Sequence, residues 1–129
     1  MKNILLVEDD ARIATALAIR LRTAGYAVTI ARDPNCGVSL AVEQTPDLVI
    51  TDLFLPQMNG LNFVGKLRGL GLDRVPFVVI TASQRAGYWE SAQQLGAAGY
   101  FEKPYDPGRL MAAVGKILDV PTTPTRINV

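Results

Sequence analysis

Leu48-Val49-Ile50-Thr51-Asp52 is the stretch that decides the fold, because four consecutive apolar or β-branched residues end in a carboxylate. Such a run suits a strand that is buried on both faces of a sheet. Prolines at 46 and 56 bound the run with turn chemistry. Asp52 is therefore predicted at the edge of the sheet where open α/β proteins bind their ligands. An aspartate that caps a helix follows a strand in the same way, so Asp52 alone does not indicate a site.

Composition limits the classes of protein to which the chain can belong. Its 129 residues suffice for one domain with a hydrophobic core, and 49 % hydrophobic with 19 % charged residues is typical of a globular chain. The net charge of +1 provides no general attraction to nucleic acid or anionic membranes. With a single cysteine no internal disulfide can form, so the expected location is the cytoplasm. The chain has no histidine, which excludes catalytic triads and histidine–metal sites within it.

Short apolar runs alternate with helical patterns along the whole chain. Asp10 is predicted to cap the first helix and Gly25 to end it, and Asp33-Pro34 opens the second helix. This alternation predicts an α/β protein of the flavodoxin-like (βα)5 class, with a doubly wound, five-stranded parallel sheet in the order 2-1-3-4-5. The expected strands are 4–7, 27–30, 48–52, 75–80 and 99–102, and the expected helices are 11–24, 34–44, 62–70, 85–95 and one that begins near 107. Residues 1–120 form the predicted domain, and 121–129 are a Pro/Thr tail or the start of a linker.

Four of the five predicted strands finish on residues suited to phosphate or metal chemistry. These are Glu8 and Asp9 after the first strand, Asp52 after the third, Thr81 after the fourth and Lys103 after the fifth. Parallel strands bring their carboxyl ends to one edge of the sheet, so these side chains are expected to meet.

Three acids at one point repel one another unless cations neutralise them. Carboxylate ligands without histidine or cysteine select Mg²⁺, or Mn²⁺, over zinc. The ammonium group of Lys103 adds a further positive charge. One oxygen of Asp52 then remains as a nucleophile that can form an aspartyl phosphate, while Lys103 and Thr81 hold the phosphoryl oxygens.

Four motifs, in this order and spacing, resemble the receiver domain of bacterial two-component response regulators, of the chemotaxis-receiver type. The resemblance covers about residues 2–120. Its motifs are Leu6-Val7-Glu8-Asp9-Asp10, Asp52 with Leu55-Pro56-Gln57-Met58-Asn59-Gly60, Thr81-Ala82, and Gly96-Ala97-Ala98-Gly99-Tyr100-Phe101-Glu102-Lys103-Pro104.

The resemblance implies a role for each matching residue. Asp52 is the implied phosphorylation site and Asp9 a direct metal ligand. Glu8 is the outer acid, acting through water, and the backbone carbonyl of Phe54 is the third protein ligand of the metal. Asp10 suits the helix cap better than the metal site. Thr81 is the implied switch hydroxyl.

The resemblance also marks residues around the site. It implies a cis peptide bond between Lys103 and Pro104. Tyr100 is either the switch aromatic or a plain core residue. Trp89 is either helix packing or part of a partner surface formed by the fourth helix, fifth strand and fifth helix. Cys36, in the second helix, is expected to be buried and inert.

In this interpretation the chain is a phosphoacceptor and not an enzyme in the ordinary sense. A histidine kinase or phosphotransfer protein donates the phosphoryl group, and the switched surface acts on an output domain or target protein. A homodimer through that surface is left open. Direct binding of nucleic acid and contact with a membrane are not expected, because the net charge is +1 and no apolar stretch reaches transmembrane length.

Three rival interpretations share part of this pattern. A flavodoxin-type FMN module needs a small polar loop after the first strand, where this chain has Glu8-Asp9-Asp10. A haloacid-dehalogenase-type phosphohydrolase wants a second aspartate two residues after the first, where this chain has Phe54. A receiver used as a phosphorylation-independent binding module does not require the complete set of acids, threonine and lysine.

Overall fold

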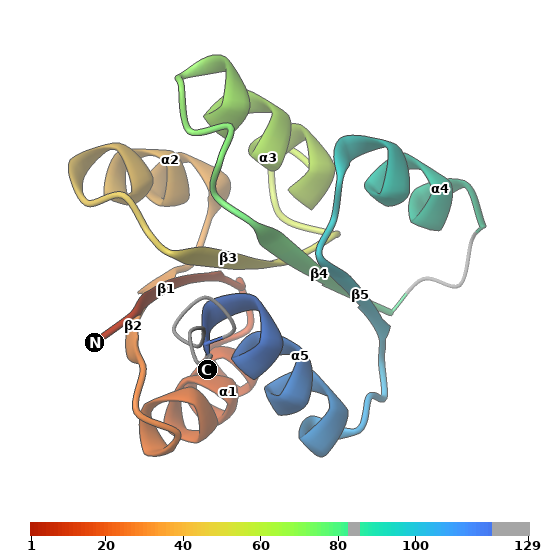
Figure 1. Cartoon of the computed structure of the whole chain (residues 1–129). Coiled ribbons are helices and arrows are strands. Elements are labelled where there is room, and N and C mark those ends of the chain that lie inside the picture. Colours follow the sequence, from red (N-terminus) through yellow and green to blue (C-terminus); the bar gives the residue numbers. More distant parts are fainter. Residues whose placement is uncertain (83–85, 120–129) are drawn as a thin grey trace, which may run out of the picture.

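Five parallel strands alternate with five helices over residues 1–82 and 86–119, the part of the chain that the computed structural model describes (Figure 1). The sheet order is β2-β1-β3-β4-β5 and every neighbouring pair is parallel, which confirms the predicted fold class. The predicted tail or linker at 121–129 lies outside the described residues. The strands are β1 (Asn3–Val7), β2 (Ala27–Ala31), β3 (Leu48–Asp52), β4 (Phe77–Thr81) and β5 (Gly99–Glu102), and the helices are α1 (Ala11–Thr23), α2 (Pro34–Glu43), α3 (Gly60–Gly69), α4 (Ala86–Leu95) and α5 (Pro107–Asp119).

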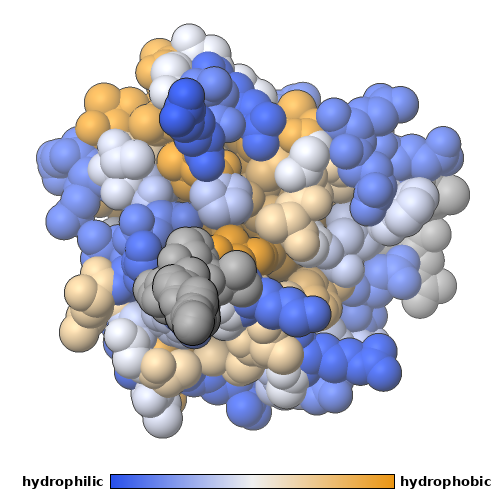
Figure 2. All heavy atoms as spheres, viewed as in Figure 1, coloured by the Kyte–Doolittle hydropathy of each residue, from blue (hydrophilic) through white to orange (hydrophobic). Residues whose placement is uncertain are grey.

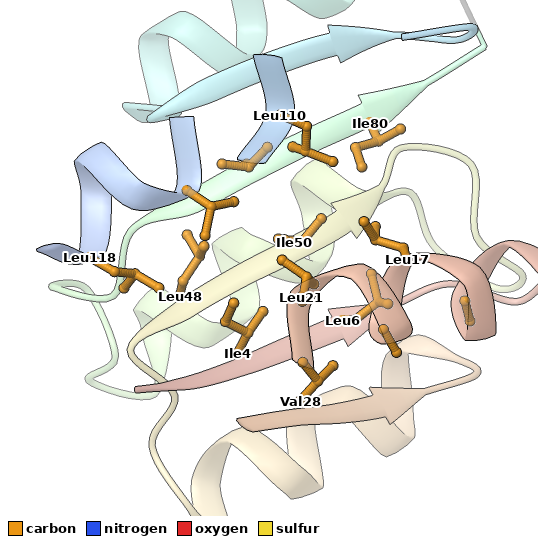
Figure 3. Close-up of a cluster of buried hydrophobic side chains, with 14 residues drawn as sticks. Ile4, Leu6, Leu17, Leu21, Val28, Leu48, Ile50, Ile80, Leu110 and Leu118 are labelled. Carbon is orange, nitrogen blue, oxygen red and sulfur yellow. The ribbon is translucent and has the colours of Figure 1, made fainter. Parts of the chain in front are cut away.

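The sheet separates two hydrophobic cores. Helices α1 and α5 cover one face, and α2, α3 and α4 cover the other (Figure 1). Alternate residues of the central strand serve the two sides: Leu48 and Ile50 belong to the core under α1 and α5 (Figure 3), and Val49 belongs to the core under the other three helices. All five residues of β3 are buried, as they are in β4, because both faces of these strands are covered.

Side-chain caps begin α1, α2, α3 and α5, and in α5 the cap is Asp106, which accepts from the N–H of Gly108 at 2.9 Å. Asp10 accepts hydrogen bonds from the backbone N–H groups of residues 12 and 13, at 2.9 and 3.1 Å, and Asp33 accepts from that of residue 36 at 2.8 Å. Gly25, with φ of 101°, follows α1 in the left-handed conformation that glycine adopts without strain. Asn59 accepts from the N–H of Asn62 at 2.8 Å, so α3 begins at Gly60, two residues earlier than predicted.

The start of one strand also differs from the prediction. Strand β4 begins at Phe77 and not at Val75, because the proline at 76 has no N–H for the ladder; the strand then extends to include Thr81. The predicted start of the fourth helix at Arg85 lies outside the described residues.

The prediction for Cys36 is wrong in respect of burial, since the residue is exposed. The buried positions of α2 are Pro34, Gly37 and Ala41, which places Cys36 on the solvent side of the helix. This helix packs closely on α3 and on β1 through small residues: a Cβ added at Gly37 would lie 2.9 Å from the ring of Phe63 and 3.3 Å from the side chain of Val7.

Polar side chains cover much of the outside. On the face shown in Figure 2, hydrophilic residues surround smaller groups of hydrophobic ones. Within the described ranges, no helix has both the length and the apolar character needed to cross a bilayer.

Candidate functional site

The carboxyl ends of β1, β3 and β5 bring one ammonium group between two carboxylates. Lys103 follows β5, and its Nζ donates to Oδ2 of Asp52 at 3.0 Å and lies 3.5 Å from Oε1 of Glu8. Both acids are buried: Glu8 is 4 % exposed and Asp52 is 8 % exposed. Residues more than 90 positions apart in the chain thus meet at the edge of the sheet that the sequence predicted.

A third acid completes a cluster suited to a hard divalent cation. Glu8, Asp9 and Asp52 each offer a carboxylate oxygen, and these oxygens lie within 4.8 Å of one another. The side chain of Asp9 is exposed, so the cluster opens to solvent on this side. Oxygen ligands of this kind, with water completing the coordination, are those that Mg²⁺ takes in phosphoryl-transfer proteins.

The surroundings of the cluster raise the pKa values of Glu8 and Lys103. Burial raises the pKa of Glu8 to about 7, and the charge of Asp52 adds to this effect; the N–H of Asp10, which donates to Oε2 at 3.1 Å, and the charge of Lys103 oppose it. Burial by itself lowers the pKa of Lys103. The hydrogen bond to Asp52 and the negative charges of Asp52 and Glu8 outweigh burial, so the pKa of Lys103 rises overall.

Phe54 contacts the site through its backbone. Its N–H donates to Oδ1 of Asp52 at 3.1 Å, so each oxygen of the Asp52 carboxylate has one donor. The Phe54 side chain turns outward and is 49 % exposed, with its ring 5.6 Å from that of Tyr88 at an interplanar angle of 87°. Nothing in the sequence pattern singled out Tyr88, because the contact depends on how the loop after β3 lies against α4. The role of the Phe54 carbonyl as a metal ligand stays a prediction.

The loop between β3 and α3 is shaped by close approach of the backbone. Gly60 donates its N–H to the carbonyl of Leu53 at 2.7 Å, and a Cβ at this position would overlap the carbonyl oxygen of Asp52. Gln57 has φ of 75°, a left-handed conformation that is uncommon outside glycine, and Asn35 of α2 donates to its side-chain oxygen at 3.0 Å. The glycine in the quoted motif was the sequence signal for this tight packing.

The remaining predicted residues lie around the same edge. Thr81 is fully buried at the end of β4, and its carbonyl accepts the backbone N–H of Lys103 at 2.8 Å. The peptide bond between Lys103 and Pro104 is cis. Trp89, on α4, is 50 % exposed.

Tyr100 is partly buried in the core under α2, α3 and α4. Burial raises the pKa of its hydroxyl, with smaller contributions from Glu102 and Tyr88. Among the described residues this buried hydroxyl has no hydrogen-bond partner. A buried polar group left unpaired is costly. Whether Tyr100 is the switch aromatic or a plain core residue stays a prediction.

Comparison with known proteins identifies the family to which the chain belongs. Residues 4–115 match the response regulator receiver domain family. The response regulator ArlR of Staphylococcus epidermidis is 33 % identical over 118 residues, which cover 92 % of this chain and 53 % of that protein. The DNA-binding response regulator MtrA of Mycolicibacterium paratuberculosis is 36 % identical over 113 residues, 88 % of this chain and 49 % of that protein. The chain thus spans about half the length of these curated relatives.

Solved structures of the same fold cover nearly all of this chain. The chemotaxis protein CheY4 of Vibrio cholerae superposes with a TM-score of 0.84 at 27 % identity, covering 92 % of this chain and 99 % of that one. A CheY-like receiver domain protein from Methanospirillum hungatei gives 0.86 at 27 % identity, covering 93 % and 95 %. Fold, cluster and sequence agree, and the chain belongs to the response regulator receiver domains of two-component systems.

Proposed function

We propose that Asp52 accepts a phosphoryl group and that this modification switches the surface around α4. The observation that supports the proposal best is the convergence of Glu8, Asp9 and Asp52 within 4.8 Å, with the ammonium of Lys103 at 3.0 Å from Asp52. This combination provides a nucleophile, a set of oxygen ligands for a cation and a fixed positive charge at one point.

The chemical step is a transfer between two groups. A carboxylate oxygen of Asp52 forms a bond to phosphorus while the bond from phosphorus to the donor's nitrogen or oxygen breaks, and the leaving group keeps the electron pair. Lys103 holds an oxygen of the transferring group, because its ammonium already lies at hydrogen-bond distance from the acceptor. The N–H of Phe54 orients the carboxylate for attack.

The acids of the cluster fit Mg²⁺, or Mn²⁺ in its place. A bound cation would neutralise negative charge on the phosphoryl oxygens. Asp9 and Asp52 would bind it directly, Glu8 would act through water, and the carbonyl of Phe54 would be the third protein ligand.

The new phosphoryl oxygens attract the hydroxyl of Thr81, which lies at the end of the neighbouring strand. Movement of this strand end gives Tyr100 room to turn and changes the surface that carries Trp89. The phosphoryl group contacts Thr81 and Lys103 in one state only, as a population shift requires.

The partners follow from the family. The donor is a histidine kinase or phosphotransfer protein. The receptor of the switched surface is an output domain joined through residues 121–129 or a separate target protein, because the matched relatives are about twice as long as the matched region. A homodimer through the same surface is the third arrangement to test.

Labelling by acetyl phosphate with Mg²⁺ tests the proposal directly. Intact mass should show one phosphoryl group on the wild type and none on Asp52→Asn. Asp47→Asn is the matched control, since Asp47 lies just before the same strand and should leave labelling unchanged. Labelling of Asp52→Asn at the wild-type level, or an unlabelled wild type, contradicts the proposal.

A further inference from the structure

An aromatic contact connects the loop after Asp52 to the beginning of α4. The rings of Phe54 and Tyr88 meet edge to face, with centroids 5.6 Å apart. Tyr88 lies in the first turn of α4, two residues after the helix begins, and it packs against the same core as Tyr100. The contact therefore spans two segments that the sheet ladder does not join.

Phe54 makes contacts through both its backbone and its side chain. Its backbone N–H donates to the Asp52 carboxylate at 3.1 Å, and its ring touches α4 through Tyr88. The ring is otherwise half exposed. A single residue thus links the predicted phosphoacceptor to α4 without passing through Thr81 or Tyr100.

The end of β4 also lies beside the loop that carries Phe54. The N–H of Leu53 donates to the carbonyl of Ile80 at 3.1 Å, which joins the ends of β3 and β4. Thr81 follows Ile80 directly, and α4 begins five residues later. In the proposed function Thr81 moves toward the modified Asp52, whereas the ring contact keeps Tyr88 beside the loop after β3.

We propose that the Phe54–Tyr88 contact holds the first turn of α4 in its unphosphorylated position, and that phosphorylation of Asp52 separates the two rings. This inference rests on the proposed function, since it concerns the regulation of the same site. Phe54 and Tyr88 are positioning residues, which act on the surface through α4. A contact made in only one state stabilises that state, so the pair opposes switching.

Trp89 reports on this movement. It follows Tyr88 directly, is half exposed and is the single tryptophan of the chain. Its fluorescence therefore measures a change in the first turns of α4 without any added label.

The experiment is an equilibrium titration of the full chain with beryllium fluoride and Mg²⁺, which mimic the phosphoryl group, read by Trp89 fluorescence. Phe54→Leu and Tyr88→Leu each remove the ring pair and should lower the midpoint of the titration roughly two- to tenfold, the range for the loss of an edge-to-face aromatic contact. The double variant should shift the midpoint no further than either single variant, because both remove the same contact.

Two variants serve as controls. Tyr88→Phe keeps the ring and should retain the wild-type midpoint. Val42→Ala trims an exposed apolar side chain on α2 and should also have no effect. Midpoints are compared in place of amplitudes, because substitution beside Trp89 alters its baseline emission, and urea unfolding of each variant verifies that it is folded.

Several results would overturn the inference. These are an unchanged or raised midpoint in both leucine variants, additive shifts in the double variant, or a wild type that is labelled on Asp52 without a change in Trp89 fluorescence. In each case the labelling of Asp52 stands, so the proposed function survives. A wild type that acetyl phosphate does not label overturns both.

Discussion

Two aspartates at opposite ends of one strand have different surroundings. Asp47 lies just before β3, where its Oδ2 accepts the N–H of Asn3 at 2.7 Å and its own N–H donates to the carbonyl of Asn3 at 2.8 Å. Asp52 ends β3, 8 % exposed, where it meets the ammonium of Lys103 and lies close to Glu8 and Asp9.

The difference distinguishes an acid that stabilises the fold from an acid that is suited to cation binding and nucleophilic attack. Asp47 pairs with neutral backbone groups and fastens the start of β1 to the start of β3. Asp52 belongs to a cluster with more negative than positive charge, which the fold holds together against repulsion. Such surplus charge favours binding of a cation and nucleophilic attack, whereas a satisfied backbone contact favours stability alone.

The largest expected effect on stability tests how closely the Asp52 end is packed. Gly60→Ala should reduce the free energy of unfolding by about 3 kcal/mol, the upper end of the usual range for overpacking, because the added Cβ would overlap the carbonyl oxygen of Asp52 and the backbone must move. Gly65→Ala in the same helix is the control: a Cβ there meets nothing within 4 Å, so stability should rise by about 0.5–1 kcal/mol. Urea unfolding measures both, and equal stability of the two variants would refute the close packing.

The second prediction concerns the proton of Glu8. Burial raises its pKa from 4.5 to about 7, so between these pH values the folded protein keeps a proton that the unfolded chain has lost. Stability from this group is therefore present at low pH and is lost as the pH rises toward 7, by about 1–3 kcal/mol in metal-free protein.

Glu8→Gln removes this dependence and keeps an acceptor for the N–H of Asp10. The difference in unfolding free energy between Glu8→Gln and wild type should grow by about 1–3 kcal/mol from pH 4 to pH 8. A difference that stays constant over this range would show that Glu8 does not titrate as the geometry requires.

The smallest expected effect lies at the Asp47 end. Asp47→Ala removes the acceptor of the Asn3 N–H and should cost about 0.5–1.5 kcal/mol in urea unfolding. Asp47→Asn keeps an acceptor oxygen and should retain most of that stability. If the asparagine variant loses as much as the alanine variant, the negative charge of Asp47 matters and the contrast with Asp52 weakens.

Most of the fold followed from local patterns. The run at 48–52 is buried as predicted, and Asp10 and Asp33 cap the first two helices as predicted. The convergence of Glu8, Asp52 and Lys103 was predictable for two reasons. The carboxyl ends of parallel strands lie at one edge of the sheet, and the family resemblance supplied the order of the strands.

The remainder depends on tertiary packing that no local pattern encodes. In α2 the small Ala41 is fully buried while Val42 is 58 % exposed, so apolar character alone selects the wrong face and misplaces Cys36. The contact between Phe54 and Tyr88 joins residues 34 positions apart, one in the loop after β3 and one in α4, and only the folded arrangement brings them together.

The separation of the two cores by the sheet has a consequence for recognition. Tyr88 and Tyr100 pack on the side of α2, α3 and α4, whereas α1 packs on the opposite side. Repacking around α4 can then proceed while the surface over α1 keeps its shape. If Asp52 is modified as proposed, a protein that binds both forms of the chain would contact the surface over α1, and a protein that distinguishes the two forms would contact the surface around α4.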